Sequence, residues 1–550
     1  MARNQAYRKA EQKIEEARRT GATKLDLSND LGTPDEKKLT ELPESLWQLT
    51  QLQSLSLSHN NLTAVPDTIG QLTQLRELKL NSNELTAVPD AIGQLTQLQT
   101  LNLNSNKLTA VPDAIGQLTQ LQTLNLNSNK LTAVPDTIGQ LIQLQSLNLY
   151  GNQLTAVPDA IGQLTQLQSL NLGGNQLTAV PATIGKLALL QTLNLGSNKL
   201  TAVPDTIGKL TELQSLNLSD NRLTAVPDTI GQLTQLQELN LYNNQLTAVP
   251  DTIGQLTQLQ SLDLRSNQLT AVPDTIGQLT QLQTLYLRNN QLKTLTDALG
   301  QLTRLKELHI AGNKLEVLPE FLSQLFQLKE LYVFSNSLQS IPDWIGELHS
   351  LEWLNIQEND IADLPITLCK LKFMRGLVLG WSKESKGIPI SKLPDWIGNL
   401  TSLEELYAAS CKLSSLPPSF TQLEHLKKLE LGNNPLNAEL AAAYEEGIEA
   451  VKAYLHAKAG MQIRLNEAKL ILVGEGEVGK TCLMDALEGL PWEEHPTTHG
   501  IEIRPIAAVD PVSGAEITLN GWDFGGQRVY RPTHQLFFSS PASCSSAASR

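Results

Sequence analysis

Apolar and polar positions follow one fixed order along most of this chain, and the first full unit of that order shows it clearly. Leu55 and Leu57 alternate with polar residues, which predicts a short strand that points both leucines to one side. Pro66 cannot continue a strand. Ile69 and Leu72 then have the spacing of a single helical or 3-10 turn. Each unit is therefore expected to contain one strand and one turn.

The same unit returns every 23 residues, marked by an asparagine after each predicted strand. The asparagines are Asn60, Asn83, Asn106, Asn129, Asn152, Asn175, Asn198, Asn221, Asn244, Asn267, Asn290, Asn313, Asn336 and Asn359. A fixed period of this length predicts a stacked solenoid. An amide both donates and accepts hydrogen bonds, so stacked asparagines can satisfy backbone groups buried at the turns. One unit buries too few aliphatic side chains to offset the entropy of ordering it, so neighbouring units must supply burial.

The pattern L-x-x-L-x-L-x-x-N-x-L, followed by L-P-x-x-I-G, resembles the leucine-rich repeat family. That resemblance implies a curved solenoid with a parallel sheet on its concave side and helical turns on its convex side. It also implies that a ligand commonly binds the concave face. We expect the solenoid to span residues 22–436.

Helical periodicity predicts a cap at each end of the solenoid. In residues 4–19, one face carries Tyr7, Ala10, Ile14 and Ala17, and a capping helix within residues 1–21 is expected. A helix that binds a partner is the alternative. Residues 437–459 predict a second helix, within a cap and connector spanning 437–466. Its predicted face consists of Leu440, Tyr444, Ile448, Val451 and Leu455.

Outward strand positions differ between the early and the later repeats. The early repeats carry Asn102, Asn125, Asn148, Asn171, Asn194, Asn217 and Asn240, which we interpret as a solvated, hydrogen-bonded face rather than a ligand site. The later repeats carry Tyr242, Arg265, Tyr286, Arg288, His309, Tyr332, Phe334, Trp353 and Tyr407. Aromatic and arginine side chains that alternate with inward leucines should face solvent, where they favour binding of a protein partner. Structural packing is the alternative. The segment GWSKESKGIPIS lengthens one later unit by six residues and predicts a looped-out insertion.

Composition limits the choice of partner and compartment. The 550 residues carry a net charge of −14, which argues against nucleic acid or an anionic membrane as the main partner. The beginning of the chain has no apolar signal core, and no run of 18 apolar residues follows. Four widely spaced cysteines show no disulfide-bonded caps, which favours a cytoplasmic location.

The segment that predicts chemistry follows the repeats. Residues 469–473, KLILV, read as a buried strand, and GEGEVGKT follows from Gly474 to Thr481 before a helical stretch. A strand, a G-x-x-x-x-G-K-T segment and a helix form the context that a phosphate-binding loop requires. Backbone N–H groups of Gly474, Glu475, Gly476, Glu477, Val478 and Gly479 would face the phosphates. Lys480 would add positive charge, and the Thr481 hydroxyl would bind Mg²⁺.

Further downstream, PTTHGIEI and WDFGGQRVYRPTHQLFF make the chain resemble the Roc domain of the Roco family. Roco proteins join leucine-rich repeats to a Ras-like Roc domain and a COR domain. The resemblance implies that Thr498 closes on Mg²⁺ and the γ-phosphate, that Asp523 holds Mg²⁺ indirectly, and that the Gly526 N–H contacts the γ-phosphate. It also implies that Gln527 orients the water that hydrolyses GTP to GDP and phosphate.

The resemblance stops within the Roc domain, after Phe538. SSPASCSSAASR follows, without the N-K-x-D guanine-specificity motif, the remaining strands or COR. We expect residues 467–538 to form the amino-terminal half of a Roc domain, truncated by a frameshift or premature stop, and residues 539–550 to form a disordered tail. GTP hydrolysis should then be impaired more than protein interaction.

The expected fold class is α/β, with a leucine-rich-repeat solenoid followed by a partial P-loop domain. The expected function is a protein-interaction scaffold with a GTP/GDP- and Mg²⁺-binding module that regulates signalling. The alternative is an interaction protein whose partial G domain no longer binds or hydrolyses GTP. An ATPase is a third hypothesis, because the phosphate loop does not select the base.

Overall fold

The computed structural model describes residues 5–461, 467–473, 480–491, 501–509, 516–524 and 543–546. The chain divides into two compact units, Met1–Leu455 and His456–Arg550. Each unit has its own sheet. None of the described helices combines the length and apolarity needed to cross a membrane.

The first unit contains a parallel sheet of 18 strands that pair in chain order. Its strands are β1 Lys24–Asp26, β2 Ser54–Ser56, β3 Glu77–Lys79, β4 Thr100–Asn102, β5 Thr123–Asn125, β6 Ser146–Asn148, β7 Ser169–Asn171, β8 Thr192–Asn194, β9 Ser215–Asn217, β10 Glu238–Asn240, β11 Ser261–Asp263, β12 Thr284–Tyr286, β13 Glu307–His309, β14 Glu330–Tyr332, β15 Trp353–Asn355, β16 Gly376–Gly380, β17 Glu405–Ala408 and β18 Lys428–Glu430. The register aligns equivalent positions of successive repeats, so Leu55 lies opposite Leu78 and Leu78 opposite Leu101. These leucines point inward and are fully buried.

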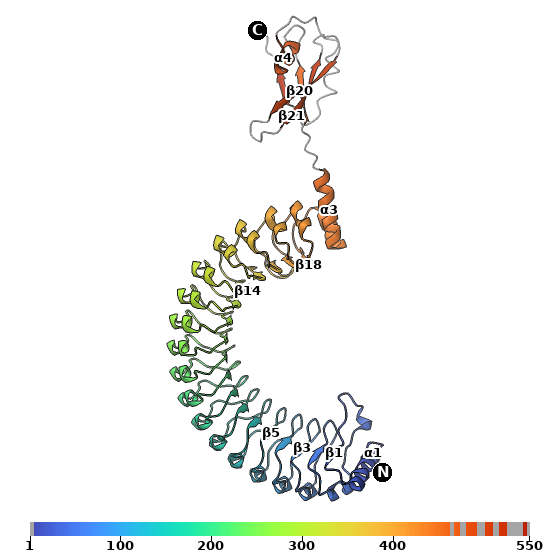
Figure 1. Cartoon of the computed structure of the whole chain (residues 1–550), viewed down its shortest axis with the longest axis vertical. Helices are drawn as coiled ribbons and strands as arrows, with labels where there is room; N and C mark the ends of the chain where they lie inside the picture. Colours follow the sequence, from blue (N-terminus) through green and yellow to red (C-terminus); the bar gives the residue numbers. More distant parts are fainter. Residues whose placement is uncertain are drawn as a thin grey trace. The chain divides into compact units, whose positions relative to one another are not determined.

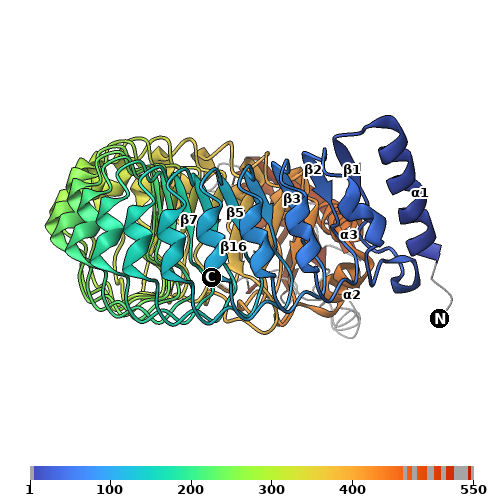
Figure 2. The same ribbon diagram turned by 90° about the horizontal axis from the view of Figure 1, so that it is seen from below.

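Short 3-10 helices lie on the convex side of this unit, and the strands line its concave side (Figure 1). They are η1 Asp35–Lys37, η2 Glu44–Gln48, η3 Asp67–Gln71, η4 Asp90–Gln94, η5 Asp113–Gln117, η6 Asp136–Gln140, η7 Asp159–Gln163, η8 Ala182–Lys186, η9 Asp205–Lys209, η10 Asp228–Gln232, η11 Asp251–Gln255, η12 Asp274–Gln278, η13 Asp297–Gln301, η14 Glu320–Gln324, η15 Asp343–Glu347, η16 Ile366–Lys370, η17 Asp395–Asn399 and η18 Pro418–Gln422. Figure 2 shows successive turns side by side along the outer surface. In η3, extended Pro66 precedes the turn, and the Leu72 N–H closes it on the Ile69 carbonyl at 3.1 Å.

The recurring asparagines form a buried hydrogen-bond ladder, as the sequence predicted. Asn198 accepts from the Leu177 N–H at 3.0 Å through Oδ1. Its Nδ2 donates to the carbonyls of Leu172 in the preceding repeat, at 3.1 Å, and of Leu195 in its own repeat, at 2.9 Å. Each asparagine therefore joins its own repeat to the one before it.

Helices cover both ends of the repeats. Helix α1, Gln5–Thr20, buries Tyr7, Ala10, Ile14 and Ala17 against the first repeat, as its periodicity predicted. At the other end, the single predicted helix is two helices, α2 Ala438–Glu446 and α3 Ile448–Met461. They are separated by Gly447, whose φ of 111° is not helical and is rarely adopted by residues with a Cβ. Leu440 of α2 and Val451 and Leu455 of α3 are buried as expected.

The second unit contains a four-stranded sheet in the order β20-β21-β19-β22. Strand β19 is Glu467–Val473, β20 is Ile501–Val509, β21 is Glu516–Phe524 and β22 is Ser543–Ser546. Helix α4, Lys480–Leu487, packs against β21. Strand β22 lies parallel to β19, so four residues of the tail expected to be disordered are a strand instead. The open edge of β19 accounts for this difference, because it offers backbone hydrogen bonds to any extended segment.

Candidate functional site

The concave face of the later repeats presents a continuous set of aromatic and charged side chains. Strand register places Tyr286 opposite His309, and His309 opposite Tyr332. Side chains that lie opposite each other on neighbouring strands are close enough to pack. The sequence-predicted partner residues on β12, β13 and β14 therefore form one row.

In this row, which we call the stacked row, five side chains contact one another in order. The Arg265 guanidinium lies 5.3 Å from the Tyr242 ring centre and 4.8 Å from that of Tyr286. The Tyr286 ring meets His309 edge-on, with 4.6 Å between ring centres. The His309 imidazole is stacked on Tyr332 at 4.1 Å. These contacts hold the side chains in place before any ligand binds.

Hydrogen bonds to carboxylates fix the ends of the same side chains. Asp263 accepts from Arg265 Nη2 at 2.6 Å, which raises the pKa of Arg265. Tyr286 Oη donates to Glu307 Oε2 at 2.8 Å. Tyr332 Oη donates to Glu330 Oε2 at 2.9 Å.

The environment of the row keeps its histidine and the two tyrosines beside it neutral at physiological pH. Burial, together with the positive charges of Arg265 and Arg288, lowers the pKa of His309 to about 4. Burial and the hydrogen bond to Glu307 raise the pKa of Tyr286 to about 12. Burial, followed by the bond to Glu330, raises the pKa of Tyr332. The row therefore presents a neutral imidazole between two neutral phenols.

A second aromatic cluster lies on β15–β18. Trp381 is stacked on Tyr407 with 4.4 Å between ring centres, and Lys428 Nζ lies 4.8 Å from the Tyr407 ring centre. Tyr407 is only 3% exposed, so the expectation that it faces solvent is wrong. The reason is the insertion after Gly380, which brings Trp381 over the tyrosine ring.

Trp353 lies on β15 and Phe334 just after β14, between Tyr332 and Trp381 in the order of the repeats. The Trp353 ring occupies the space that a Cβ on Gly376 would need, and its centre is 6.4 Å from that of Tyr407. Arg288 lies over the Phe334 ring at 4.9 Å. Arg288 is exposed, whereas Trp353 and Phe334 are half-buried. The structure thus brings together all the predicted partner residues on one face, with Tyr407 beneath the surface.

Sequence reasoning missed several members of this face. Trp381 lies in an insertion and outside the repeat period, so it has no equivalent position in other repeats that could have identified it. Asp263, Glu307 and Glu330 do occupy outward strand positions of their repeats. Their place beside the aromatic positions could have identified them as part of this face.

The asparagines on the concave face of the early repeats are hydrogen-bonded to the backbone, as expected of a hydrogen-bonded sheet face. Each accepts, through Oδ1, the backbone N–H two residues later. In the first of them, Asn102 accepts from the Asn104 N–H at 3.1 Å. The same bond recurs at Asn125, Asn148, Asn171, Asn194, Asn217 and Asn240.

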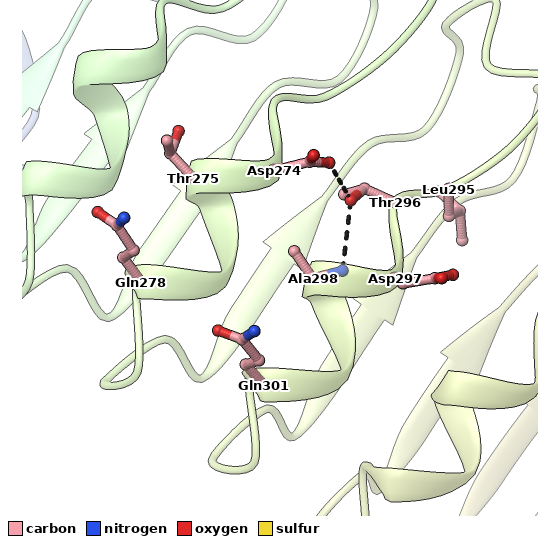
Figure 3. Close-up of a pocket in the computed structure, with 8 residues that line it drawn as sticks. All are labelled: Asp274, Thr275, Gln278, Leu295, Thr296, Asp297, Ala298 and Gln301. Carbon is pink, nitrogen blue, oxygen red and sulfur yellow. Dashed lines mark hydrogen bonds between the residues drawn. The ribbon is translucent and has the colours of Figure 1, made fainter.

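A hollow of about 750 Å³ lies on the convex side, between η12 and η13 (Figure 3). It lies where Thr296 replaces the proline of the other repeats. The Thr296 hydroxyl accepts from the Ala298 N–H at 3.3 Å and donates to Asp274. The hollow is open and its threonine is engaged in capping η13, so we assign no ligand to it.

The predicted nucleotide-binding residues lie in the second unit, and the structure describes only part of them. Helix α4 begins at Lys480, and half-buried Thr481 lies in its first turn. Asp523 lies on β21, where the register pairs it with Leu472 near the end of β19. Gly474, Glu475, Gly476, Glu477, Val478, Gly479, Thr498, Gly526 and Gln527 lie outside the described residues.

Comparison with known families decides the classification of the repeats. The family described as "Leucine-rich repeat region" matches residues 91–173, 159–247, 239–335 and 316–448. The chain belongs to the leucine-rich repeat family. A second leucine-rich repeat family matches residues 35–85 and 50–108. The family "Ras of Complex, Roc, domain of DAPkinase" matches residues 469–546 of this leucine-rich-repeat protein.

Similar curated proteins carry one or the other of these two parts in their names. A Roc-COR-CHAT protease from an unknown prokaryotic organism is 35% identical over 160 residues, which cover 26% of this leucine-rich-repeat chain and 15% of the protease. Leucine-rich repeat serine/threonine-protein kinase 1 of Mus musculus is 29% identical over 161 residues, covering 28% of this chain and 8% of the kinase. Leucine-rich repeats followed by a Roc segment are the Roco-type arrangement. The chain spans only 15% and 8% of the lengths of these two relatives.

Solved structures with this fold include other leucine-rich-repeat proteins. A Leptospira interrogans leucine-rich-repeat protein aligns with a TM-score of 0.63 at 36% identity, covering 74% of this chain and 97% of that one. The plant peptide hormone receptor RGFR1, solved in complex with RGF2, aligns with a TM-score of 0.61 at 31% identity, covering 75% and 69% of the two chains.

Proposed function

We propose that this protein is an interaction scaffold whose later repeats bind a protein ligand and whose Roc segment binds guanine nucleotide with Mg²⁺. The groups of contacting aromatic and cationic side chains on the concave face of β10–β18 are the observation that carries the proposal for the repeats. Rings and guanidinium groups that are already held in place lose little entropy on binding, which is the property of interface anchors. The RGFR1 neighbour, whose structure contains RGF2, supports a peptide or protein as ligand.

The described part of the Roc segment fits a nucleotide phosphate. A strand leads toward the G-x-x-x-x-G-K-T segment, and α4 begins at its lysine, so a helix N-terminus follows the loop. Thr481 in that first turn and Asp523 at the end of the neighbouring strand would hold Mg²⁺, the latter indirectly. The bound ion would neutralise phosphate charge. Thr498, Gly526 and Gln527 would complete the site and act on the γ-phosphate, with GTP hydrolysis as the proposed reaction.

Titration of the purified chain with a fluorescent GTP analogue tests the nucleotide proposal. We expect binding that requires Mg²⁺, that excess GTP reverses and excess ATP does not, and that Lys480→Ala abolishes. Lys458→Ala, in α3, is the matched control and should bind as wild type does. Absence of binding, or equal competition by ATP, would reject the guanine-nucleotide proposal and leave the interaction function in place.

Selected peptides can stand in for the natural ligand in a test of the concave face. Peptides selected from a random library on the wild-type chain should bind Phe334→Ala and Arg288→Ala at least about tenfold more weakly, as expected for loss of an interface anchor. Tyr150→Ala removes an exposed ring from the same column of an early repeat and should leave binding unchanged. Peptides that are indifferent to all three changes would place the binding surface elsewhere.

We also propose a reducing cytoplasm as the location. Among the described residues, Cys369, Cys411 and Cys482 form no disulfide. Burial raises the pKa of Cys411 to about 12, which makes its thiol unreactive. Fractionation of cells that express the tagged chain would test this location, and recovery in the membrane or secreted fraction would contradict it.

A further inference from the structure

Two glutamates lie directly opposite each other on the concave face, on neighbouring strands β13 and β14. The register pairs Glu307 with Glu330. Within the described sheet of the first unit, this is the one pair of acidic side chains in such a position. Like charges opposite each other on neighbouring strands are destabilising.

Neither carboxylate has a lysine or arginine partner among the described residues. Two equivalent glutamates elsewhere in the same column have a cation beside them: Glu77 pairs with Lys79 at 2.7 Å, and Glu405 lies opposite Lys428. Within the described part of the chain, the hydrogen bonds that Glu307 and Glu330 accept come from tyrosine hydroxyls, which leave the negative charge in place. No described cation therefore offsets the repulsion between these two carboxylates.

An imidazole nitrogen faces this pair. His309 Nε2 lies 3.9 Å from Glu307 Oε2. It is shielded from solvent and has no hydrogen-bond partner within the described part of the chain. One ligand atom from each of Glu307, His309 and Glu330 lies within 4.8 Å of the others. An unpartnered buried nitrogen calls for an explanation, and a bound ion is one.

We propose that Glu307, His309 and Glu330 bind a divalent transition-metal ion, with Zn²⁺ as the best match to one nitrogen and two carboxylate ligands. Metal–ligand distances of about 2.0–2.2 Å in a tetrahedral site bring ligand atoms to about 3.4 Å from one another. Small rotations of the two glutamate side chains, which are half-buried rather than packed in the core, would close the present spacing. Three protein ligands leave one position open for water or for a group of a bound partner.

The surroundings orient these ligands as the outer hydrogen-bond partners do in known metal sites. Tyr286 and Tyr332 each donate a hydrogen bond to one of the carboxylates. The rings of the same tyrosines pack on either side of the imidazole. The Arg265 guanidinium, which lies over the Tyr286 ring, is already paired with Asp263.

Calorimetric titration of the full chain with Zn²⁺, after removal of metal with a chelator, tests the proposal. We expect one equivalent that binds to the wild type and is lost in both His309→Ala and Glu330→Gln. Glu238→Gln changes a glutamate of the same column that faces no other acid, and it should keep that equivalent. Tyr332→Phe should weaken binding by about tenfold, because it removes the hydrogen bond that orients Glu330.

Thermal unfolding separates metal binding from a folding defect. Without metal, Glu330→Gln should melt at or above the wild-type temperature, because repulsion within the pair is relieved. Added Zn²⁺ should raise the melting temperature of the wild type and of Glu238→Gln, and leave Glu330→Gln unchanged. A wild type that binds no Zn²⁺, or equal binding by the wild type and both ligand variants, would overturn the proposal.

Discussion

Replacement of a single asparagine in the middle of the buried ladder should destabilise the solenoid by a predictable amount. Asn198, which is 8% exposed, makes one accepted and three donated hydrogen bonds to the backbone. In Asn198→Ala the bonds are lost, but the carbonyls of Leu172 and Leu195 each keep a second asparagine donor, Asn175 and Asn221. The group left without a partner is the Leu177 N–H.

The expected loss follows from this count. An unpaired buried N–H costs about 1–3 kcal/mol, and the weakened carbonyl bonds add roughly 1 kcal/mol. We therefore expect Asn198→Ala to lower the free energy of unfolding by about 3 kcal/mol. The double variant Asn198→Ala/Asn221→Ala also removes both donors of the Leu195 carbonyl. It should lose about 1–3 kcal/mol more than the sum of the single variants.

Urea denaturation followed by circular dichroism measures the overall loss, and amide hydrogen exchange locates it. The Leu177 amide should exchange faster in Asn198→Ala, whereas amides in distant repeats should not change. Asn194→Ala provides the control, because Asn194 lies on the concave face and accepts one bond, from Gly196, at 2.9 Å. That variant should lose about 0.5–1 kcal/mol.

Two results would refute this reasoning. Equal losses in Asn198→Ala and Asn194→Ala would show that burial of the ladder contributes nothing. Strict additivity in the double variant would show that Asn198 and Asn221 do not support each other at the Leu195 carbonyl.

Three further predictions test other parts of the first unit. Gly376→Ala should displace the Trp353 ring, lower stability by about 1–3 kcal/mol and change tryptophan fluorescence. Thr206→Val should raise stability by about 1 kcal/mol in urea denaturation, because the buried Thr206 hydroxyl has no hydrogen-bond partner among the described residues. His309 has a folded pKa of about 4, below the 6.5 of an unfolded histidine, so the unfolded chain takes up the proton first as pH falls from 6.5 to 4. Stability should therefore decrease through that window, and His309→Phe should flatten the decrease; an NMR titration midpoint near 6.5 would contradict the assignment.

Periodicity predicted the solenoid because its cause is local. The spacing of leucines, proline and asparagine within one repeat sets the strand, the turn and the buried amide, and the same spacing recurs with every unit. The face of α1 was likewise readable, since Tyr7 and Ile14 are two helical turns apart. The division of the second cap was missed because helical spacing continues across Gly447.

Contacts between repeats could be predicted only in part. The outward strand positions of the repeats identified the residues of the stacked row. The pairing of Glu307 with Glu330, however, depends on the strand register. The burial of Tyr407 depends on an insertion that lies outside the repeat period. The predicted nucleotide contacts of Gly474–Gly479, Thr498, Gly526 and Gln527 lie outside the described residues and stay predictions. Tertiary context, rather than local pattern, decided each case that the sequence missed.

The amide ladder has a consequence for how such a chain can change its length. Among the described residues, the side chain of Asn198 bonds only to its own repeat and the one before it, and the same bonds recur at each asparagine, so the boundary between any two early units is chemically the same. Deletion or duplication of one whole 23-residue unit would join surfaces that already fit. A deletion of any other size would leave carbonyls facing leucines. Variation in repeat number is thus tolerated in whole steps, and it alters the span between the amino-terminal cap and the ligand face without altering either one.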